Sequence, residues 1–337
     1  MSKSEILLSV IIPCKNEEKN IERCLRSVLS EVKNISSFEI LLVDSRSTDR
    51  SIEKAKQFPV DIIQLRDNWF SSPASARYLG CLNTTGKYIF VIDADMELIP
   101  GFLEKAIEFL DANEQTAGVA GMGAEYYDDG SVREDMYKRG NRFAQVFLLA
   151  GAAMFKRQAL LASGGYFNPF LKAEEEQEIC IRLLKAGFKL FSLPYPMIKH
   201  YTSLNIDNFR RRLNAGMYRG IGQMFRLTLV QGNFSFAYFT RFKLFYVFIA
   251  LITVFCCAIF ALARNTDNSL LLLWSGIIVL IWLFSCYIKR GVKEGTNSMY
   301  KCILINTHIL QGLFDHTPKI SEYPQEVIVI KKGKEKI

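Results

Sequence analysis

Residues 88–95 read YIFVIDAD, and this stretch decides the fold that the sequence predicts. Five apolar residues, Tyr88–Ile92, have the length of a buried β-strand and run directly into two carboxylates, Asp93 and Asp95. An uninterrupted apolar strand is typical of a sheet that is covered on both faces. The stretch therefore predicts a central strand with acidic side chains at its carboxyl end.

The residues before this stretch alternate between strand-like and helix-like patterns. Short apolar runs rich in β-branched residues predict strands at 7–12, 38–43 and 60–65. Apolar residues at helical spacing predict helices at 16–29, 51–58 and 74–82. Such alternation is typical of parallel strands joined by helices. The predicted fold class is therefore α/β, a Rossmann-like, mainly parallel sheet with helices on both faces.

Polar residues follow three of the predicted strands. Asn16 and Glu17 come shortly after the first strand, Asp44 ends the second, and Asp93 and Asp95 follow the last. Ligands of open α/β sheets bind beyond the carboxyl ends of the strands. These side chains are therefore expected to converge on one site.

Asp93 and Asp95 are the strongest indication of a metal site. Two carboxylates one residue apart suit a divalent cation that bridges a diphosphate, and hard oxygen ligands favour Mg²⁺ or Mn²⁺. A solvated turn is the alternative for such a triplet alone, but this one lies between the apolar residues Ile92 and Leu98. His200 is a further candidate ligand, although a single histidine is more often structural.

The acidic run EEEQE at residues 174–178 predicts a second group of functional side chains. Clustered carboxylates repel one another, which raises the pKa of some of them into a range that suits a general base. The alternative is the first turn of a helix, where the helix dipole favours acidic side chains. A turn at residues 164–169 could bring the run over the sheet, so that base and metal share one cleft.

Two long apolar runs occupy residues 242–263 and 270–288. Each has about the 20 residues that a membrane-spanning helix needs, and the short connection leaves room only for a tight turn. Basic residues flank the outer ends, against a single Arg264 in the turn, so the positive-inside rule predicts a membrane hairpin with both chain ends in the cytoplasm. A buried helical hairpin in a soluble core is the alternative, but the interior of both runs lacks charges.

The formal net charge is +8, and much of the basic excess lies late in the chain, beside the apolar runs. Attraction to anionic lipid headgroups explains that placement better than nucleic-acid binding, so we expect membrane lipids and no nucleic acid as partners. The short polar N-terminus leaves no room for a signal peptide, which predicts a cytoplasmic first domain.

These patterns predict four parts of the chain. They are a cytoplasmic catalytic domain at 1–205, amphipathic interfacial helices at 206–240, two transmembrane helices at 241–290 and a cytoplasmic tail at 291–337. Within the tail we expect a helix at 298–314 and a disordered, lysine-rich end.

Five motifs, in order along the first two hundred residues, resemble the inverting family 2 glycosyltransferases, which have the glycosyltransferase-A fold. They are VIIPCKNEE at 10–18, VDSRSTD at 43–49, ARYLG and TGKY between 76 and 88, DAD at 93–95, and AGAAMF at 150–155 with the stretch 165–182. The resemblance therefore implies this fold and transfer of a sugar from a nucleotide-diphosphate sugar.

The resemblance also implies roles for single residues. Asp95 would be the direct metal ligand, with Asp93 in support. The implied contacts to the nucleotide sugar are Pro13, Asn16, Glu17, Asp44, Arg77 and Asp93, of which Asp44 would contact the base.

Two positions depart from the family pattern. The family usually has a Glu-Asp pair on the acceptor side, where this chain has Glu175 and Glu176. Both are candidate bases, and the position favours Glu176. Ser45 and Arg46 replace a second acid and a glycine of many members, which could shift the nucleotide preference.

Together these features predict a metal-dependent, inverting hexosyltransferase that acts on a lipid-linked acceptor or builds cell-envelope or exopolysaccharide glycans. One alternative is a noncatalytic membrane scaffold with the same fold. Another is a sugar nucleotidyltransferase, although the expected glycine-rich phosphate loop does not follow the first strand. The sequence leaves open the sugar and nucleotide of the donor, the identity of the acceptor and the oligomeric state.

Overall fold

The computed structural model describes residues 6–133, 142–149, 151–202, 207–230, 232, 242–264 and 269–333. Its strands are β1 (Leu8–Cys14), β2 (Phe38–Asp44), β3 (Asp61–Gln64), β4 (Tyr88–Val91), β5 (Met96–Leu98), β6 (Thr116–Tyr127), β7 (Val132–Arg133), β8 (Ala144–Val146), β9 (Ala153–Lys156), β10 (Lys189–Thr202) and β11 (Ile328–Lys331). Its α-helices are α1 (Ile21–Glu31), α2 (Ser51–Ala55), α3 (Pro73–Leu82), α4 (Phe102–Ala112), α6 (Arg157–Ala162), α7 (Glu175–Lys185), α8 (Asp207–Asn214), α9 (Met217–Val230), α11 (Lys243–Ala263), α12 (Ser269–Ile288) and α13 (Val292–Gly312). Two short 3₁₀ helices are η1 (Val32–Asn34) and η3 (Ile320–Glu322).

Within the described residues, eleven strands form one sheet, in the order β11-β3-β2-β1-β4-β9-β6-β10-β5, with β7 beside β6 and β8 beside β10. The strands β3, β2, β1 and β4 are parallel, and so are β6 and β10. β9 runs antiparallel between β4 and β6, and the edge strands β5 and β11 are antiparallel to their neighbours. The predicted α/β class is confirmed, and the antiparallel strands are features that the strand–helix alternation did not predict.

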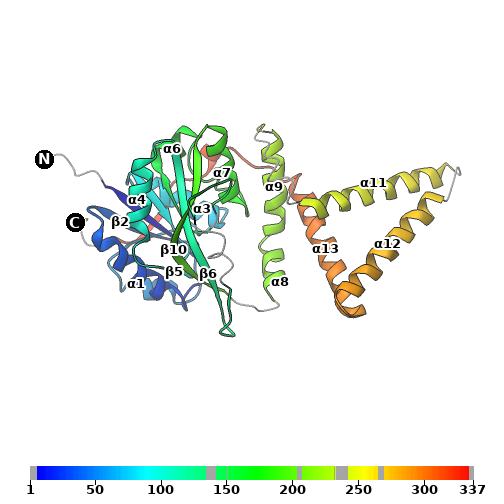
Figure 1. Cartoon of the computed structure of the whole chain (residues 1–337), viewed down its shortest axis with the longest axis horizontal. Coiled ribbons are helices and arrows are strands. Elements are labelled where there is room, and N and C mark those ends of the chain that lie inside the picture. The colour runs from blue at the N-terminus through cyan, green and yellow to red at the C-terminus, as the bar shows by residue number, and fades with distance from the viewer. Residues whose placement is uncertain are drawn as a thin grey trace.

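Helices cover both faces of this sheet, as Figure 1 shows. Side chains alternate along each strand, so Val10 and Phe90 pack with α1 and α4 on one face. Ile11 and Val91 pack with α3 and α7 on the other face. Burial of one large apolar side chain contributes about 1.5–3 kcal/mol, so the two layers fix the strands firmly. The carboxyl ends of β1, β2 and β4 consequently lie at one edge of the sheet.

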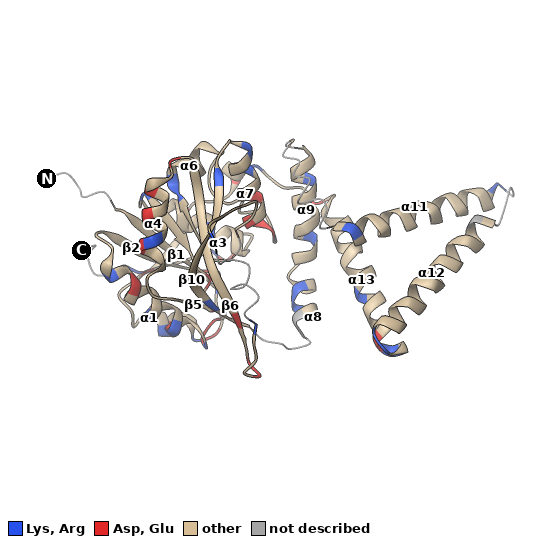
Figure 2. Ribbon diagram, in the orientation of Figure 1, with Lys and Arg blue, Asp and Glu red and all other residues tan. Residues whose placement is uncertain are grey.

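The helices after β10 extend away from this domain. α8 and α9 lie beside the domain, and α13 follows outward (Figure 1). α11 and α12 form a V-shaped hairpin at the far end, with α13 across the open side of the V. α11 and the stretch Leu271–Ile288 of α12 are long and apolar enough to cross a membrane. Figure 2 shows Lys and Arg near the ends of these two helices and almost no charge between them.

The side chains of the α11–α12 hairpin are mostly exposed. In α11 the buried residues are Phe245 and Ala258, and none is buried in the stretch Leu271–Ile288 of α12. Large exposed apolar surfaces of this kind mark membrane or partner contacts rather than a soluble core. The buried hairpin that the sequence left as an alternative is therefore not what the structure shows.

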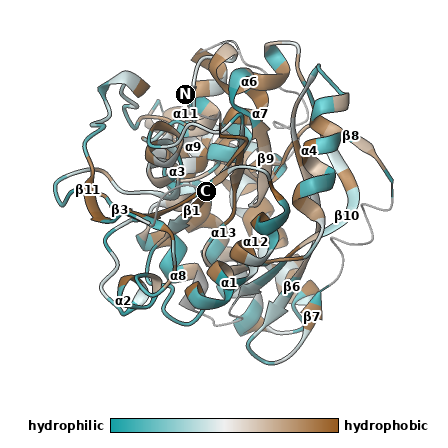
Figure 3. Cartoon of the chain, turned by 90° about the vertical axis from the view of Figure 1, so that its left-hand side faces the viewer, coloured by the Kyte–Doolittle hydropathy of each residue, from teal (hydrophilic) through white to brown (hydrophobic). Residues whose placement is uncertain are grey.

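The segment after α13 returns to the first domain. β11 pairs with β3, which Figure 3 shows at the edge of the sheet. Tyr323 is buried, and its hydroxyl donates a hydrogen bond to the Phe70 carbonyl at 2.6 Å. The prediction of a disordered lysine-rich end is wrong for Lys331, which belongs to β11, and residues 334–337 lie outside the described residues.

Candidate active site

Three loops at the carboxyl edge of the sheet contain a residue with left-handed backbone. Asn16 after β1 has φ 57°, Arg46 after β2 has φ 63°, and Glu174 before α7 has φ 67°. Asparagine adopts this conformation more readily than other residues, whereas for arginine and glutamate it costs about 1–3 kcal/mol. Backbone strain of this kind tends to gather at functional sites, and here it falls in the loops that the sequence singled out.

The loops after β1 and β2 are bound to each other by side-chain hydrogen bonds. Asp44 is fully buried, and its carboxylate accepts from the Ser47 hydroxyl at 2.5 Å and from Gln64 Nε2 at 2.7 Å. Asn16 Oδ1 accepts from the Thr48 backbone N–H at 2.8 Å. Asp44 therefore shapes this loop, and its contact with a nucleotide base stays a prediction. Pro13 is buried within β1, and its contact with a nucleotide sugar likewise stays a prediction.

Arg77 of α3 lies at the centre of the candidate site. Its guanidinium, 2% exposed, contacts Asp93 Oδ1 at 2.8 Å and Glu176 Oε1 at 2.8 Å, and it also pairs with Glu175. Burial lowers the pKa of Arg77, but the three carboxylates outweigh burial and hold this pKa well above its ordinary value. One buried cation thus joins the end of β4 to the start of α7. The predicted contact of Arg77 with a nucleotide sugar stays a prediction.

The two candidate bases differ in their surroundings. The side chain of Glu175 is 5% exposed, whereas that of Glu176 is 22% exposed. Burial, and then the neighbouring charge of Glu176, raise the pKa of Glu175 above its ordinary value. Glu175 is therefore enclosed beside Arg77, while Glu176 keeps a face that another molecule can reach.

Asp95 and His200 lie together because β10 pairs with β5, with His200 opposite Met96. His200 Nε2 lies 3.2 Å from Asp95 Oδ2, and this hydrogen bond raises the pKa of His200. Asp95 Oδ1 is buried and receives no hydrogen bond from the residues that the structure describes.

These donors fit a hard divalent cation. Asp95 offers an unused carboxylate oxygen and His200 an imidazole nitrogen, both of which Mg²⁺ or Mn²⁺ sites contain. Across the described ranges, no group of three or more His, Cys, Asp or Glu side chains could hold a metal ion, and Asp93 is engaged with Arg77. A site with two protein ligands leaves room for phosphate oxygens, which is how proteins often bind Mg²⁺.

Glu17, in the loop after β1, accepts a hydrogen bond from Asn20 Nδ2 at 2.8 Å. Burial raises the pKa of Glu17 to about 7, while the charge of Arg211 acts in the opposite direction. Arg211 belongs to α8, so this helix contributes a positive charge to the same edge of the sheet. The sequence did not place Arg211 at the site, because its basic run had been assigned to the membrane surface.

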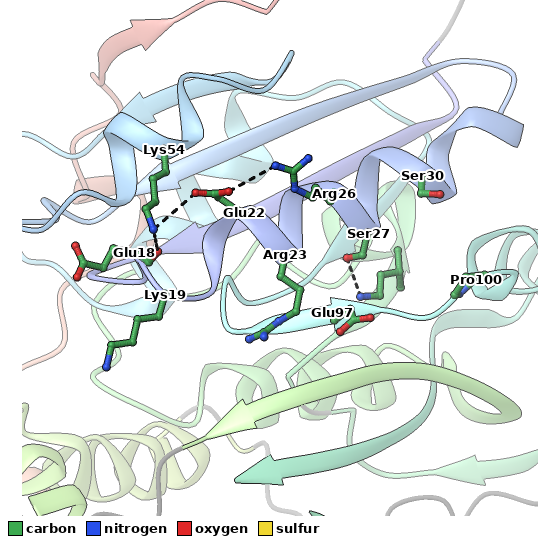
Figure 4. A pocket seen from close by; sticks show the side chains of 11 residues that line it. Glu18, Lys19, Glu22, Arg23, Arg26, Ser27, Ser30, Lys54, Glu97 and Pro100 are labelled. Atoms are coloured by element: carbon green, nitrogen blue, oxygen red, sulfur yellow. Dashed lines mark hydrogen bonds and ion pairs between the residues drawn. The ribbon is translucent and has the colours of Figure 1, made fainter. Parts of the chain in front are cut away.

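A cavity that the structure describes lies outside this group of residues. It has a volume of about 660 Å³ and runs along the outer side of α1 (Figure 4). Glu22 forms ion pairs in its wall, with carboxylate oxygens 3.7 Å from Lys54 Nζ and 3.6 Å from Arg26 Nη2. None of the predicted catalytic or metal-binding residues lines it.

Two sequence families match the chain. The family described as Glycosyl transferase family 2 matches residues 9–162. The family described as Glycosyl transferase family group 2 matches residues 88–287, which is more than half of the chain. The matched residues include every predicted catalytic and metal-binding position.

Similar proteins come from archaea. The dolichyl N-acetyl-alpha-D-glucosaminyl phosphate 3-beta-D-2,3-diacetamido-2,3-dideoxy-beta-D-glucuronosyltransferase of Methanococcus voltae is 24% identical over 326 residues, covering 87% of this chain and 99% of that protein. The dolichol-phosphate mannosyltransferase of Pyrococcus furiosus is 28% identical over 190 residues, covering 54% of this chain and 50% of that protein.

A similar solved structure is that of residues 1–349 of Staphylococcus aureus TarS in complex with UDP. It matches with a TM-score of 0.50 and 19% identity, covering 66% of this chain and 71% of that chain. At this identity the likeness concerns the fold alone, and it confirms the fold that the sequence predicts.

Proposed function

Because this chain belongs to the family 2 glycosyltransferases, we propose that it transfers a sugar from a nucleoside diphosphate sugar to a hydroxyl group of a lipid-linked acceptor, with inversion at the anomeric carbon. The observation that carries the proposal is the arrangement around Arg77. It holds the accessible Glu176 on one side and Asp93 on the other, two residues from Asp95. An acceptor-side base and a donor-side carboxylate are thereby fixed to the same buried cation.

Glu176 is the proposed general base. Its carboxylate takes the proton of the acceptor hydroxyl while the acceptor oxygen forms a bond to the anomeric carbon. The bond from that carbon to the diphosphate breaks in the same step, and its electron pair goes to the leaving oxygen. Arg77 orients Glu176 through their ion pair, and attack from the face opposite the leaving group inverts the centre.

Asp95 and His200 are the proposed metal ligands, on the strength of the unused Asp95 oxygen. A bound Mg²⁺ or Mn²⁺ supplies positive charge at the leaving diphosphate. Asp93 is then not a metal ligand. It accepts a hydrogen bond from Arg77 and holds that side chain in place.

The loops with Asn16, Glu17 and Asp44 are the proposed nucleotide site, because they lie at the carboxyl ends of β1 and β2. A uridine nucleotide is favoured by the UDP in the TarS structure. A lipid-linked acceptor is favoured by the names of the two archaeal relatives, both of which refer to dolichyl or dolichol phosphate.

We also propose that the α11–α12 hairpin anchors the protein in a membrane with the catalytic domain on the cytoplasmic side. Two helices that form a hairpin return the chain to the side from which it came. The pairing of β11 with β3 supports this arrangement, because it joins the chain after the hairpin to the domain before it.

The proposal is tested by incubating purified full-length protein with Mn²⁺ and a panel of uridine and guanosine diphosphate sugars, and measuring release of nucleoside diphosphate. Wild-type protein is expected to release it from one donor. Asp95→Asn and Glu176→Gln should each lower the rate about a hundredfold or more, because each removes one catalytic effect.

Glu108→Gln is the matched control, since it removes a carboxylate that is exposed on α4. Its rate should stay within about twofold of wild type, as for most exposed substitutions. Unchanged release by Asp95→Asn and Glu176→Gln would contradict the proposed site. Neither release nor binding of any nucleotide by wild type would instead favour the noncatalytic scaffold.

A further inference from the structure

A second cavity, of about 290 Å³, lies between the first domain and the helices that lead to the membrane hairpin. The domain contributes Phe70, Phe170 and Lys172, and the segment after α13 contributes Asp315, His316 and Pro318. The wall is therefore apolar on one part and charged on another. α9, which contributes Gln223 to the lining, and α13 stand between the sheet and the α11–α12 hairpin in Figure 1.

Positive charges outnumber negative ones beside this cavity. Lys172 Nζ lies 3.1 Å from Asp315 Oδ2, and Arg219 donates to both oxygens of the same carboxylate. Arg226 Nη1 donates to the Asp315 carbonyl at 3.0 Å. Two cations therefore share the Asp315 carboxylate and a third contacts the carbonyl of the same residue, which leaves an excess of two positive charges in this cluster.

Close backbone packing fixes the walls of the cavity relative to one another. A Cβ atom on Gly220 of α9 would lie 2.4 Å from the Ala173 nitrogen, and one on Gly222 would lie 2.0 Å from the Ile309 carbonyl oxygen of α13. Only glycine permits these approaches. The Lys172 N–H also donates to Gln223 Oε1 of α9 at 3.2 Å. Lys172 precedes Glu176, the proposed base, by four residues, so this wall of the cavity is close to the base in the sequence.

A phosphate group on an apolar chain matches this lining. Lysine and arginine bind phosphate through charge-assisted hydrogen bonds. Asp315 lines the cavity and pairs both with Lys172 of the same lining and with Arg219 beside it. The rings of Phe70 and Phe170 offer apolar contact to the chain that carries the phosphate. We propose that this cavity binds the phosphate of the lipid-linked acceptor. Its ligands are Lys172, which lines the cavity, and Arg219, which shares the Asp315 carboxylate with Lys172. The inference rests on the proposed function, which supplies the lipid-linked acceptor.

The test uses full-length protein in detergent with farnesyl phosphate, a soluble prenyl phosphate, as the probe in a calorimetric titration. Wild-type protein is expected to bind it at least tenfold more tightly than farnesol, which lacks the phosphate. Lys172→Gln and Arg219→Gln should each weaken binding about tenfold, as expected for loss of one charge-assisted hydrogen bond. Equal binding of farnesol, or unchanged affinity in both variants, would overturn the inference.

Lys293→Gln is the matched control, because Lys293 is an exposed lysine of α13 that does not line the cavity. Its affinity for farnesyl phosphate should stay within twofold of wild type, and an equal loss would point to general charge attraction and overturn the site. His316→Ala serves if the Lys172 variant unfolds, since the exposed His316 lines the same cavity. We expect weaker binding of farnesyl phosphate in that variant, and unchanged binding would count against the inference.

Two further probes separate the sources of phosphate. Inorganic phosphate that binds as tightly as farnesyl phosphate would identify a free-phosphate site and overturn the lipid part. Phosphatidylglycerol vesicles that compete equally would identify a membrane headgroup site and overturn the acceptor part. Farnesyl phosphate binding without sugar transfer from any donor would contradict the proposed function alone, whereas transfer without such binding would contradict this inference alone.

Discussion

The Arg77 cluster and the Asp315 cluster have opposite charge arrangements. In the first, one guanidinium is shared by the carboxylates of Asp93, Glu175 and Glu176. In the second, one residue, Asp315, is shared by three cations. The first cluster carries excess negative charge where a donor diphosphate and its metal are proposed to bind, and the second carries excess positive charge where a lipid phosphate is proposed to bind.

The two clusters also differ in their exposure to water. The side chain of Arg77 is 2% exposed, whereas that of Arg219 is 38% exposed. A buried ion pair cannot exchange a partner for water, so the loss of one member leaves an uncompensated charge. A partly exposed pair can exchange partners at little cost. The comparison therefore indicates that the Arg77 cluster holds the site together, while the Asp315 cluster can release a cation to a ligand.

Arg77→Met breaks the buried cluster and should have the largest effect on stability. It leaves three carboxylates near one another without their cation, which typically costs about 3–5 kcal/mol. We expect the melting temperature to fall by about 10 °C and activity to be lost. Thermal unfolding in detergent measures the effect, with Lys293→Met as an exposed control. A melting temperature within 2 °C of wild type would show that the carboxylates do not depend on Arg77.

Asp315→Asn breaks the second cluster and should have a smaller effect. The side chains of Lys172 and Arg219 keep access to water, so loss of their partner should cost about 1 kcal/mol. The melting temperature should fall by about 2–4 °C, and less at high salt, because salt screens exposed charges. A loss as large as that of Arg77→Met would erase the distinction between the clusters.

Glu17 extends the comparison to a half-buried carboxylate whose hydrogen-bond donor is neutral. That donor is the side-chain amide of Asn20 rather than a cation. Burial raises the pKa of Glu17 to about 7, above its ordinary value near 4.5. The folded protein therefore binds this proton more tightly than the unfolded chain does, and stability falls as pH rises from about 4.5 to 7. Glu17→Gln should stabilise the protein by about 1 kcal/mol at pH 8, allowing for partial exposure.

At pH 5 most of the stabilisation by Glu17→Gln should disappear, because Glu17 is then largely protonated in the folded wild-type protein. Melting temperatures of wild type and Glu17→Gln at the two pH values give the comparison directly. A gain that is equal at pH 5 and pH 8 would mean that Glu17 does not titrate in this range.

Local patterns in the sequence predicted the four parallel strands β3, β2, β1 and β4 of the eleven in the sheet. The apolar runs at 7–12, 38–43, 60–65 and 88–92 correspond to β1, β2, β3 and β4. A buried strand can be recognised from a few consecutive apolar residues, without knowledge of its partners. β11 was not predicted. It pairs with β3, with Val329 opposite Ile63, and no local sequence pattern indicates a pairing between residues so far apart in the chain. The short antiparallel strands β5 and β7 likewise have too few residues for a periodic signal.

The candidate site was predicted in composition but not in arrangement. The motifs named Arg77, Asp93, Glu175 and Glu176, and the structure joins them through ion pairs. The sequence could not tell which glutamate is buried, because the left-handed turn at Glu174 sets the direction of both. The Asp315 cluster was not foreseen, since Lys172 and Asp315 are 143 residues apart.

The most direct test of the account compares kcat for Glu176→Gln and Glu175→Gln, using whichever donor the wild-type protein accepts. We expect Glu176→Gln to lower kcat at least about a hundredfold with a melting temperature close to wild type, because the accessible carboxylate is the base. Glu175→Gln should instead lower the melting temperature, since it breaks a buried ion pair, and lower kcat by about tenfold or less. The reverse pattern, with kcat kept by Glu176→Gln and abolished by Glu175→Gln in a folded protein, would contradict the assignment of Glu176 as the base.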